Sequence, residues 1–413
     1  MTPNRGASRV VITGIGSVSG YGWGVQALRQ GLRSGRTAIT EPRIFDTGGQ
    51  RTHLAAEAPE VPESCTEGIS AWKTLSQADR FAVVAAREAV DMADLDATGP
   101  DVGVYFGGST AGMVECEEWV GRILGCRPGS PHLSLLASQQ LSGPGDAVAR
   151  FLGVSGPVQG YSAACASGAL ALGAAIDAVR GSEVQAAVVG GSDSLCLLTY
   201  AGFNSLRSVD VEACRPFRAD RAGLSLGEGA GVLVLEDFDR ALARGAKPLA
   251  ELRGFGSSCD AHHMTAPHPE GDGALAAMWA ALEDAGLQPA ELSAVNAHGT
   301  GTTHNDVAEA AALTRLMGSD LCSVPLLAPK ACVGHVLGAA GALEAVVTVL
   351  ALEDGVVYPT PGGEPADPDL GVDLVVGEER RLADDAALWM SMNFAFGGAN
   401  AAVVIQGWRE AGA

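Results

Sequence analysis

The sequence predicts an α/β protein, because segments of strand length alternate with segments of helical periodicity along nearly the whole chain. The strand-like runs are apolar, and several end in glycine, as buried strands do when they lead into tight turns. Such alternation predicts parallel or mixed sheets. The predicted strands are residues 9–16, 102–108, 184–191, 231–237, 292–299 and 399–406, and the predicted helices are residues 81–93, 166–181, 273–286 and 341–355.

Two of the predicted helices lack a polar face. Residues 166–181 and 341–355 carry alanine and glycine where a surface helix would carry charge. A helix that is apolar all round is buried, so we expect both to pack between layers. The chain shows neither a short tandem repeat nor a low-complexity linker. One compact catalytic body is therefore expected.

The composition favours a globular enzyme and disfavours two classes of partner. Hydrophobic residues make up 47% of the 413 residues, and the formal net charge is −21. This charge repels nucleic acid and anionic membrane surfaces. No stretch approaches the ~20 apolar residues of a membrane span, and no basic arm precedes an apolar core at the N-terminus. We expect a cytoplasmic protein whose nine scattered cysteines are reduced.

Three segments resemble known functional motifs but do not match them fully. TGIGSVSG (13–20) lacks the third glycine of a dinucleotide fingerprint, because Ser19 occupies that position. GLSLG (223–227) has the spacing of a hydrolase nucleophile elbow, but its strand follows Ser225 instead of preceding it. A serine hydrolase that uses Ser225 stays a remote alternative. DAHHMTAPH (260–268) contains three histidines without the spacing of a zinc site, so we expect a polar loop and no metal.

Three separated segments carry residues suited to catalysis. Cys165, in SAACASG, directly precedes a predicted helix, whose N-terminus would stabilise a thiolate, although a free cysteine is more often a buried apolar residue. NAHGTGT places His298 just after a strand, and KACVGHVLGAAGALE contains Lys330, His335 and Glu344. Each segment alone is weak evidence. Their occurrence together, in this order, favours a reactive cysteine.

With these segments the chain resembles the β-ketoacyl-acyl-carrier-protein synthases, in the branch that has one cysteine and two histidines. Seven ordered blocks carry the resemblance: RVVITGIGSVS, ACASG, RPFRADRAGLSLGEGAGVLVLE, GFGSSCDAHHMTAPHP, NAHGTGT, KACVGHVLGAAGALE and NFAFGGANAAVVI. The resemblance implies a thiolase-like fold of two similar βαβαβαβ halves in a five-layer α-β-α-β-α sandwich. Residues 1–255 would carry the nucleophilic cysteine, and residues 256–413 the two histidines and a gate loop.

The resemblance also implies a reaction, a decarboxylative Claisen condensation. An acyl chain held on Cys165 is extended by malonyl-acyl-carrier protein, and the backbone N–H groups of Cys165 and Phe396 form the oxyanion hole. His298 and His335 stabilise the enolate, and Lys330 fixes His335 with Glu344 as its buried partner. The implied substrate-binding residues are Thr300, Thr302, Phe203 and Thr110, with Thr110 on the tunnel floor.

Two departures from the family pattern bear on gating and docking. The usual G-F-G-G loop reads Ala395-Phe396-Gly397-Gly398 here, beside a gate residue at Asp260, and alanine resists the positive φ that glycine accepts. We therefore expect a stiffer or differently placed gate. The carrier-docking cluster is reduced to Lys73 and Arg80, with Arg207 retained. A sparse cluster favours a dedicated carrier protein or a partner subunit, hence specialised metabolism.

The implied partners and the alternatives complete these expectations. The partners are an acyl carrier protein and a second subunit, in a homodimer or in a heterodimer with a related chain-length subunit, joined through sheet edges near residues 184–191. No cofactor is implied, because the substrates arrive on a phosphopantetheine arm. A housekeeping fatty-acid synthase is the alternative pathway. A thiolase would need a C-terminal catalytic cysteine, but the last cysteine is Cys332.

Overall fold

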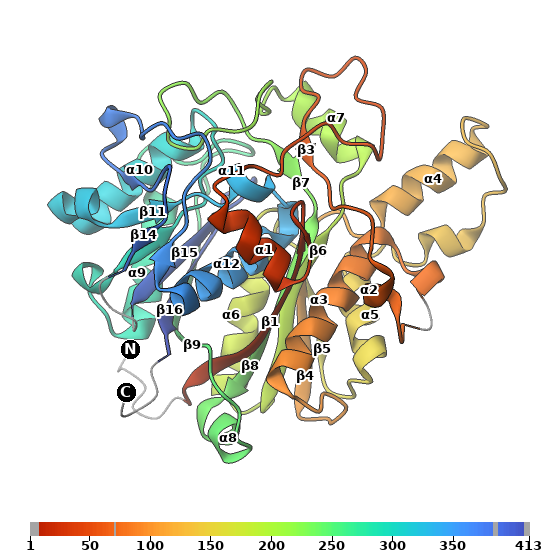
Figure 1. The fold of residues 1–413 in the computed structure, drawn as a ribbon, viewed down its shortest axis with the longest axis horizontal. Coiled ribbons are helices and arrows are strands. Elements are labelled where there is room, and N and C mark those ends of the chain that lie inside the picture. The colour runs from red at the N-terminus through yellow and green to blue at the C-terminus, as the bar shows by residue number, and fades with distance from the viewer. Residues whose placement is uncertain (1–7, 70–71, 383–386, 409–413) are drawn as a thin grey trace.

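The computed structural model describes residues 8–69, 72–382 and 387–408 and shows one large mixed sheet clad with helices (Figure 1). The strand order is β13-β11-β10-β15-β16-β9-β1-β8-β6-β4-β5, and β2 pairs with β1. The strands are β1 (Val10–Ser19), β2 (Gly22–Trp23), β4 (Val102–Gly107), β5 (Val158–Tyr161), β6 (Ala186–Asp193), β8 (Gly229–Asp237), β9 (Ala250–Cys259), β10 (Ala294–Asn296), β11 (Pro325–Leu327), β13 (Asp373–Leu374), β15 (Leu388–Phe394) and β16 (Ala399–Gly407).

This sheet consists of two halves that have the same strand topology. The order β5-β4-β6-β8-β1 in the first half matches β11-β10-β15-β16-β9 in the second, with the same parallel and antiparallel pairings. The halves join through three residue pairs between the first residues of β1 and β9. The predicted division at residue 255 falls within β9, whereas the two repeats separate between β8 and β9.

Helices between these strands repeat in the same way. In the first half they are α3 (Gln77–Ala93), α5 (Gly143–Leu152) and α6 (Ser167–Arg180), and in the second α9 (Asp272–Ala285), α10 (Asn305–Met317) and α12 (Ala340–Asp354). The remaining helices are α1 (Val25–Arg33), α2 (Glu63–Thr66), α4 (Met113–Ile123), α7 (Leu197–Ser205), α8 (Phe238–Ala243) and α11 (Lys330–Val333). The α4 segment projects from the rest of the molecule (Figure 1).

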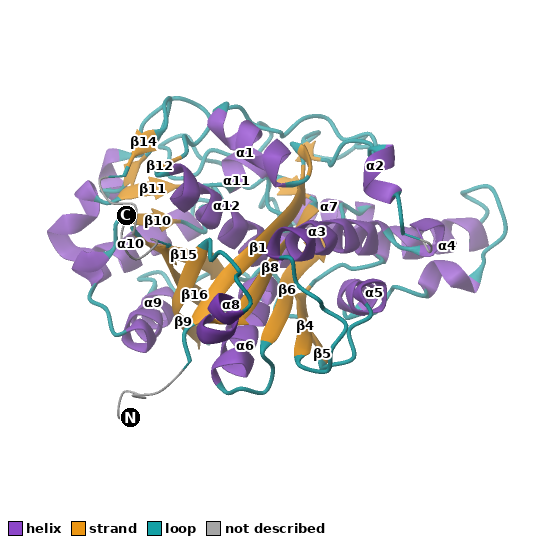
Figure 2. Cartoon of the chain, turned by 60° about the horizontal axis from the view of Figure 1, so that its bottom comes forward, coloured by secondary structure: helices purple, strands orange, loops and turns teal. Residues whose placement is uncertain are grey.

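Five layers follow from where the helices pack (Figure 2). Helices α6 and α12 contact strands of both halves and share one hydrophobic cluster with them. The outer face of the first half-sheet packs on α3 and α5, and that of the second on α9 and α10. The fold is therefore the predicted five-layer thiolase-like sandwich. The two helices that lack a polar face form its central layer, as the sequence predicts.

Close backbone contacts explain the glycines of TGIGSVSG. A Cβ on Gly14 would lie 2.0 Å from the carbonyl oxygen of Ala89, and a Cβ on Gly16 would lie 1.9 Å from that of Ala85. Both oxygens belong to α3, which packs directly on β1. These glycines therefore allow α3 to pack closely on β1, which explains them without a bound dinucleotide.

Some elements differ from the sequence prediction. Four strands of the repeated topology, β5, β9, β11 and β15, are absent from the predicted set. The pattern of β9 is irregular, because it mixes buried and exposed positions and contains glycine. The strand that carries VQAAVVGG, β6, lies between β8 and β4. The free edge of the first half-sheet is β5, so an edge-to-edge contact through that half uses β5. Among the described residues, no helix is both long and apolar enough to cross a membrane.

Candidate active site

A tight turn between β5 and α6 presents Cys165. Ala164 adopts the left-handed conformation with φ 47°, which costs an alanine roughly 1–2 kcal/mol. The Ser167 hydroxyl holds the turn, because it accepts a hydrogen bond from the Ala163 N–H at 2.9 Å and donates one to the Ala164 carbonyl at 2.6 Å. Cys165 is thereby placed at the start of the central helix, 7% exposed.

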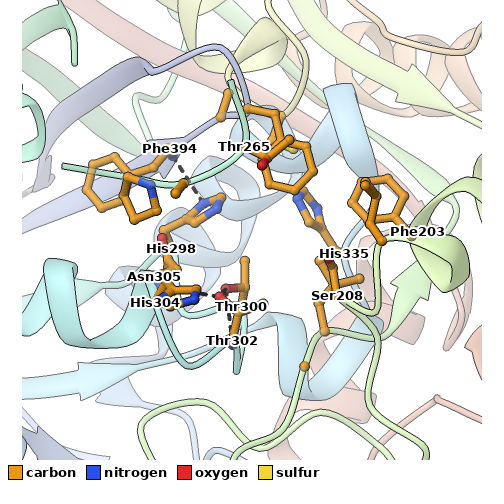
Figure 3. A pocket seen from close by; sticks show the side chains of 18 of the residues that line it. Phe203, Ser208, Thr265, His298, Thr300, Thr302, His304, Asn305, His335 and Phe394 are labelled. Atoms are coloured by element: carbon orange, nitrogen blue, oxygen red, sulfur yellow. Dashed lines mark hydrogen bonds between the residues drawn. The ribbon is translucent and has the colours of Figure 1, made fainter. Parts of the chain in front are cut away.

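The thiol lines a cavity of about 440 Å³ in which most of the predicted site residues meet. Figure 3 shows His298 and His335 on the same cavity, with Thr300, Thr302 and Phe203 around them. The mouth contains Arg207, which is exposed. The gate residues Ala395, Phe396, Gly397 and Asp260 also line it.

Several predicted residues do not line this cavity, among them Lys330, Glu344 and Gly398. Thr110 is not among the residues that line this cavity, and its hydroxyl donates a hydrogen bond to Asp193 at 2.9 Å. Lys73 is exposed on a short turn, Trp72–Thr74, and does not line the cavity either. Arg80 lies over the Trp72 ring, 5.4 Å from its centre. The cavity therefore brings together the predicted cysteine, both histidines and the two threonines, but not Thr110 or Lys73.

His298 is held so that its Nε2 carries the proton. It follows β10, and its backbone N–H donates to Glu309 at 2.7 Å. Its Nδ1 accepts the Phe394 N–H at 3.2 Å and faces the Lys330 ammonium at 3.2 Å. An imidazole nitrogen that accepts hydrogen bonds is unprotonated, so a neutral ring carries its proton on the other nitrogen.

The same holds for His335. Its backbone N–H donates to the Ser225 carbonyl at 2.7 Å, and its Nδ1 accepts the Leu337 N–H at 3.2 Å. The rings of His298 and His335 stand nearly perpendicular, with centres 5.7 Å apart. Burial, and then the Lys330 charge, lower the pKa of both imidazoles well below 6.5. The cavity is thus supplied with two neutral Nε2–H donors.

Lys330 contacts His298 and not His335, contrary to what the resemblance implies. Its ammonium donates to the His298 carbonyl at 2.6 Å and to Glu344 at 2.5 Å. The other oxygen of Glu344 accepts the Asn393 amide at 2.7 Å. His335 instead receives its backbone contacts from Ser225 and Leu337, because the turn after α11 carries it away from Lys330. The predicted Lys330–Glu344 pair is present and fully buried.

Burial favours the thiol form of Cys165. The sequence predicts a thiolate stabilised at a helix N-terminus, but burial outweighs that effect and raises the pKa of Cys165 to about 11. The Lys330 charge and hydrogen bonds from the backbone N–H groups of Phe396 and Cys165 act in the opposite direction. Those two N–H groups therefore lie near the sulfur, where they could donate to the carbonyl oxygen of a thioester that the sulfur attacks.

The gate loop is tied to the loop that contains Asp260. The Asp260 N–H donates to the Gly398 carbonyl at 2.8 Å, and its carboxylate accepts the Asn400 amide at 2.7 Å. Phe396 stacks on Phe203 with ring centres 5.6 Å apart. Positive φ occurs at Gly397 and Gly398 but not at Ala395. Ala395 therefore does not need the positive φ that alanine resists in this conformation, because the turn places its left-handed residues at the two glycines.

Several buried polar residues escape the sequence analysis. Glu309 accepts the N–H groups of His298 and Gly299, and Asp306, one turn earlier on α10, accepts those of Gly301 and Phe217. Burial raises the pKa of Glu309 to about 8. Acidic residues three apart at the start of a helix, just after a glycine loop, are the signal that could have revealed them.

The remaining sequence motifs have structural roles. Ser225 is buried, its hydroxyl accepts the Cys214 N–H at 3.0 Å, and its carbonyl holds His335, so GLSLG supports the histidine. His263 accepts the N–H groups of Thr265 and Ala266 through Nδ1. Within residues 8–69, 72–382 and 387–408, no group of three or more His, Cys, Asp or Glu side chains is arranged to hold a metal ion.

Comparisons with known proteins agree with this geometry. Residues 7–241 match the Beta-ketoacyl synthase, N-terminal domain, and residues 249–364 match the Beta-ketoacyl synthase, C-terminal domain. The chain is 36% identical to 3-oxoacyl-[acyl-carrier-protein] synthase 2 of Synechocystis sp., over 96% of this chain and 97% of that protein.

Solved structures show the same fold. The ishigamide ketosynthase/chain length factor superposes with a TM-score of 0.91 and 35% identity, over 98% of this chain and 100% of that one. A type II PKS acyl-carrier protein in complex with its ketosynthase, bound to the hexaketide, gives a TM-score of 0.88 and 27% identity, over 97% of this chain and 100% of that one. The similarity therefore extends over both halves of the sheet.

Proposed function

The chain belongs to the β-ketoacyl synthase family and is an acyltransferase of that family, and from this premise we propose that Cys165 carries the acyl chain during elongation. The Cys165 sulfur attacks the thioester carbon of an acyl-carrier protein. The tetrahedral oxyanion accepts the N–H groups of Cys165 and Phe396, whose effect on the sulfur supports this placement. The carbon–sulfur bond to the carrier breaks, and the thiol proton ends on the leaving pantetheine sulfur.

The second half-reaction uses both histidines. Malonyl-acyl-carrier protein loses carbon dioxide, and the electron pair of the broken bond forms an enolate on the thioester oxygen. That oxygen accepts hydrogen bonds from the Nε2–H groups of His298 and His335, which are neutral because their pKa values are low. The enolate carbon then attacks the acyl-cysteine and releases the Cys165 thiolate, which takes up a proton. The product is a β-ketoacyl-carrier two carbons longer.

We assign the positioning of the carrier's pantetheine arm to residues at the mouth of the cavity. Thr300 and Thr302, with their hydroxyl oxygens 3.0 Å apart, face the path that the pantetheine arm takes to the thiol. Arg207 is exposed at the same mouth and offers a cation to an acidic carrier protein. We propose that the reaction needs neither a metal nor a redox cofactor, because thioester exchange and decarboxylation transfer no electrons to an external acceptor.

The pathway and the partner are assigned by similarity. Similar proteins include a ketosynthase/chain length factor, and a ketosynthase in complex with its acyl-carrier protein. With the sparse docking cluster, they favour type II polyketide or other specialised synthesis, in which a chain-length subunit or a second copy completes the dimer. The similarity to 3-oxoacyl-[acyl-carrier-protein] synthase 2 supports the housekeeping fatty-acid alternative. A cytoplasmic location stays a prediction.

One observation carries this proposal: both histidines use Nδ1 as an acceptor and line the same cavity as Cys165. The test combines the protein with an acyl-carrier and a malonyl-carrier and measures β-ketoacyl product by mass spectrometry. We expect His298→Ala and His335→Ala each to lower condensation at least 100-fold while Cys165 is still acylated. His132→Ala, at an exposed histidine outside the cavity, is the matched control. Unchanged condensation in both site variants would refute the assignment.

A further inference from the structure

Asp193 is a buried carboxylate that the mechanism above does not use. It ends β6, is fully buried, and accepts hydrogen bonds from the backbone N–H groups of Ser109, Thr110, Ala111 and Gly338. The hydroxyls of Ser109 and Thr110 donate to it as well, at 2.7 and 2.9 Å. A carboxylate with this many donors fixes the backbone around it, because charged hydrogen bonds are roughly twice as strong as neutral ones.

The contact with Gly338 connects Asp193 to the catalytic histidine. The Gly338 N–H donates to Asp193 at 2.7 Å and also lies 3.1 Å from the Ser109 hydroxyl. The preceding residue, Leu337, donates its own N–H to Nδ1 of His335 at 3.2 Å. One peptide unit therefore separates the carboxylate from the group that sets the proton position on His335.

Strained backbone on both sides of Asp193 shows that the carboxylate holds a conformation the chain would not adopt unaided. Leu337 has φ 53° and Ala111 has φ 43°, both in the left-handed region. This region costs residues with a Cβ roughly 1–2 kcal/mol each. Such strain persists only where surrounding contacts over-determine it. Around Leu337 and Ala111, those contacts include the bonds of Gly338 and Ala111 to Asp193.

We propose that Asp193 is a positioning residue for His335: by holding Gly338 it keeps Leu337 left-handed, so that the Leu337 N–H occupies Nδ1 and the proton stays on Nε2. The inference rests on the proposed function of His335 and deepens it. Without the carboxylate, Leu337 relaxes, Nδ1 loses its donor, and the ring can carry its proton on either nitrogen. Only the Nε2–H form donates to the enolate oxygen, so decarboxylation suffers more than acylation of Cys165.

The first readout is independent of activity. Magic-angle-spinning ¹⁵N NMR of ring-labelled histidine protein reports the protonated nitrogen, and His335→Gln identifies the His335 signals. We expect one tautomer in the wild type, with Nε2 protonated, and a mixture of two in Asp193→Asn. A single wild-type tautomer in Asp193→Asn would overturn the inference. A wild type that fails to decarboxylate malonyl-carrier would instead refute the proposed function, and the tautomer comparison would still stand.

The second readout separates the half-reactions. Asp193→Asn should lower kcat for malonyl-carrier decarboxylation at least tenfold, with KM unchanged, and change the rate of single-turnover acylation of Cys165 less than threefold. Ser109→Ala, which removes one hydroxyl contact, should cause a smaller loss of the same kind and decides the question if Asp193→Asn does not fold. Equal losses in both half-reactions, or none, would contradict the proposal.

Glu228 provides the matched control. It is also fully buried and accepts the backbone N–H groups of Ala58 and Leu195, at 3.0 and 2.9 Å. Burial raises its pKa to about 8, and glutamine keeps its size and one accepting oxygen. Glu228→Gln should keep the His335 tautomer and the ratio of the half-reactions. If it reproduces the Asp193→Asn pattern, the effect belongs to buried carboxylates in general and not to Asp193.

Discussion

At the residue scale, the chemistry of the site depends on where protons reside. The two imidazoles are neutral and offer Nε2–H groups, while Cys165, the proposed nucleophile, rests as a thiol. This combination suits an enolate, which needs hydrogen-bond donors, better than it suits general-base catalysis by the histidines. It also leaves the empty enzyme weakly reactive, since the thiolate is the nucleophilic form.

Alkylation of Cys165 tests the protonation state of the nucleophile. Because burial raises its pKa to about 11, the thiolate fraction rises about tenfold for each pH unit below that value. The iodoacetamide rate at Cys165, followed by peptide mass spectrometry, should therefore climb without a plateau from pH 7 to pH 10. Exposed Cys322 in the same sample serves as the internal control. A plateau near pH 7 would show a preformed thiolate.

The low pKa values of the histidines predict how stability depends on pH. The folded rings stay neutral just below pH 6.5, whereas the rings of the unfolded chain bind protons there. Proton binding stabilises the unfolded state, so the free energy of unfolding falls as the pH drops. Each ring contributes about 1.4 kcal/mol per pH unit. Urea unfolding of the wild type and of His335→Gln between pH 6.5 and 5.0 should give a shallower loss in the variant. Equal slopes would contradict a depressed pKa at His335.

Some residues of the site could be predicted from the sequence, and others could not. Cys165, His298, His335 and the Lys330–Glu344 pair could be found because they lie in distinctive blocks. The assignment of Lys330 to His335 failed, because only the turn after α11 decides which ring the ammonium faces. Asp193 escaped for a related reason, since its donors come from loops about 80 and 145 residues away.

At the element scale, close packing of helices on strands shapes the molecule. Small residues let α3 approach β1 and let α6 and α12 share the central layer. A Cβ on Gly168 of α6 would lie 2.9 Å from the Ala342 nitrogen of α12. The alternation of strands and helices was predictable from apolar runs and periodicity. The irregular β9 was not, because glycine and exposed positions interrupt its pattern.

Alanine substitution tests this packing. Gly16→Ala places a Cβ 1.9 Å from the Ala85 carbonyl oxygen, so α3 must move away from β1. We expect a loss of about 2 kcal/mol or more in the free energy of unfolding, measured in urea. Gly202→Ala, in helix α7 with no atom within 4 Å of the new Cβ, should be neutral or stabilising. Equal effects of the two substitutions would contradict the account.

At the scale of the whole molecule, one side of the first half carries features of an interface. The edge strand β5 is largely exposed, and α4 projects from the body (Figure 1). Exposed apolar side chains are found on α4, on the segment that follows it and on β5: Val120, Ile123, Leu124, Leu133, Leu141 and Val158. Apolar surface beside an unpaired strand edge is typical of a subunit contact.

This surface leads to a prediction of the oligomeric state. We expect the chain to sediment as a dimer, alone or with a related subunit, and Leu124→Asp with Leu133→Asp to shift it to monomers. Leu242→Asp, at another exposed apolar position, on α8, is the control and should leave the dimer intact. A wild-type monomer in the presence of both candidate partners, or a dimer unaffected by the double substitution, would contradict this assignment.

The most direct test of the central claim is the mass of the intact protein after mixing with a panel of acyl-carrier proteins. The account predicts a covalent acyl adduct, located on Cys165 by peptide mapping, that is lost in Cys165→Ala and discharged as β-ketoacyl product when malonyl-carrier is added. The absence of a Cys165 adduct with every acyl chain offered, or an adduct that persists in Cys165→Ala, would contradict it.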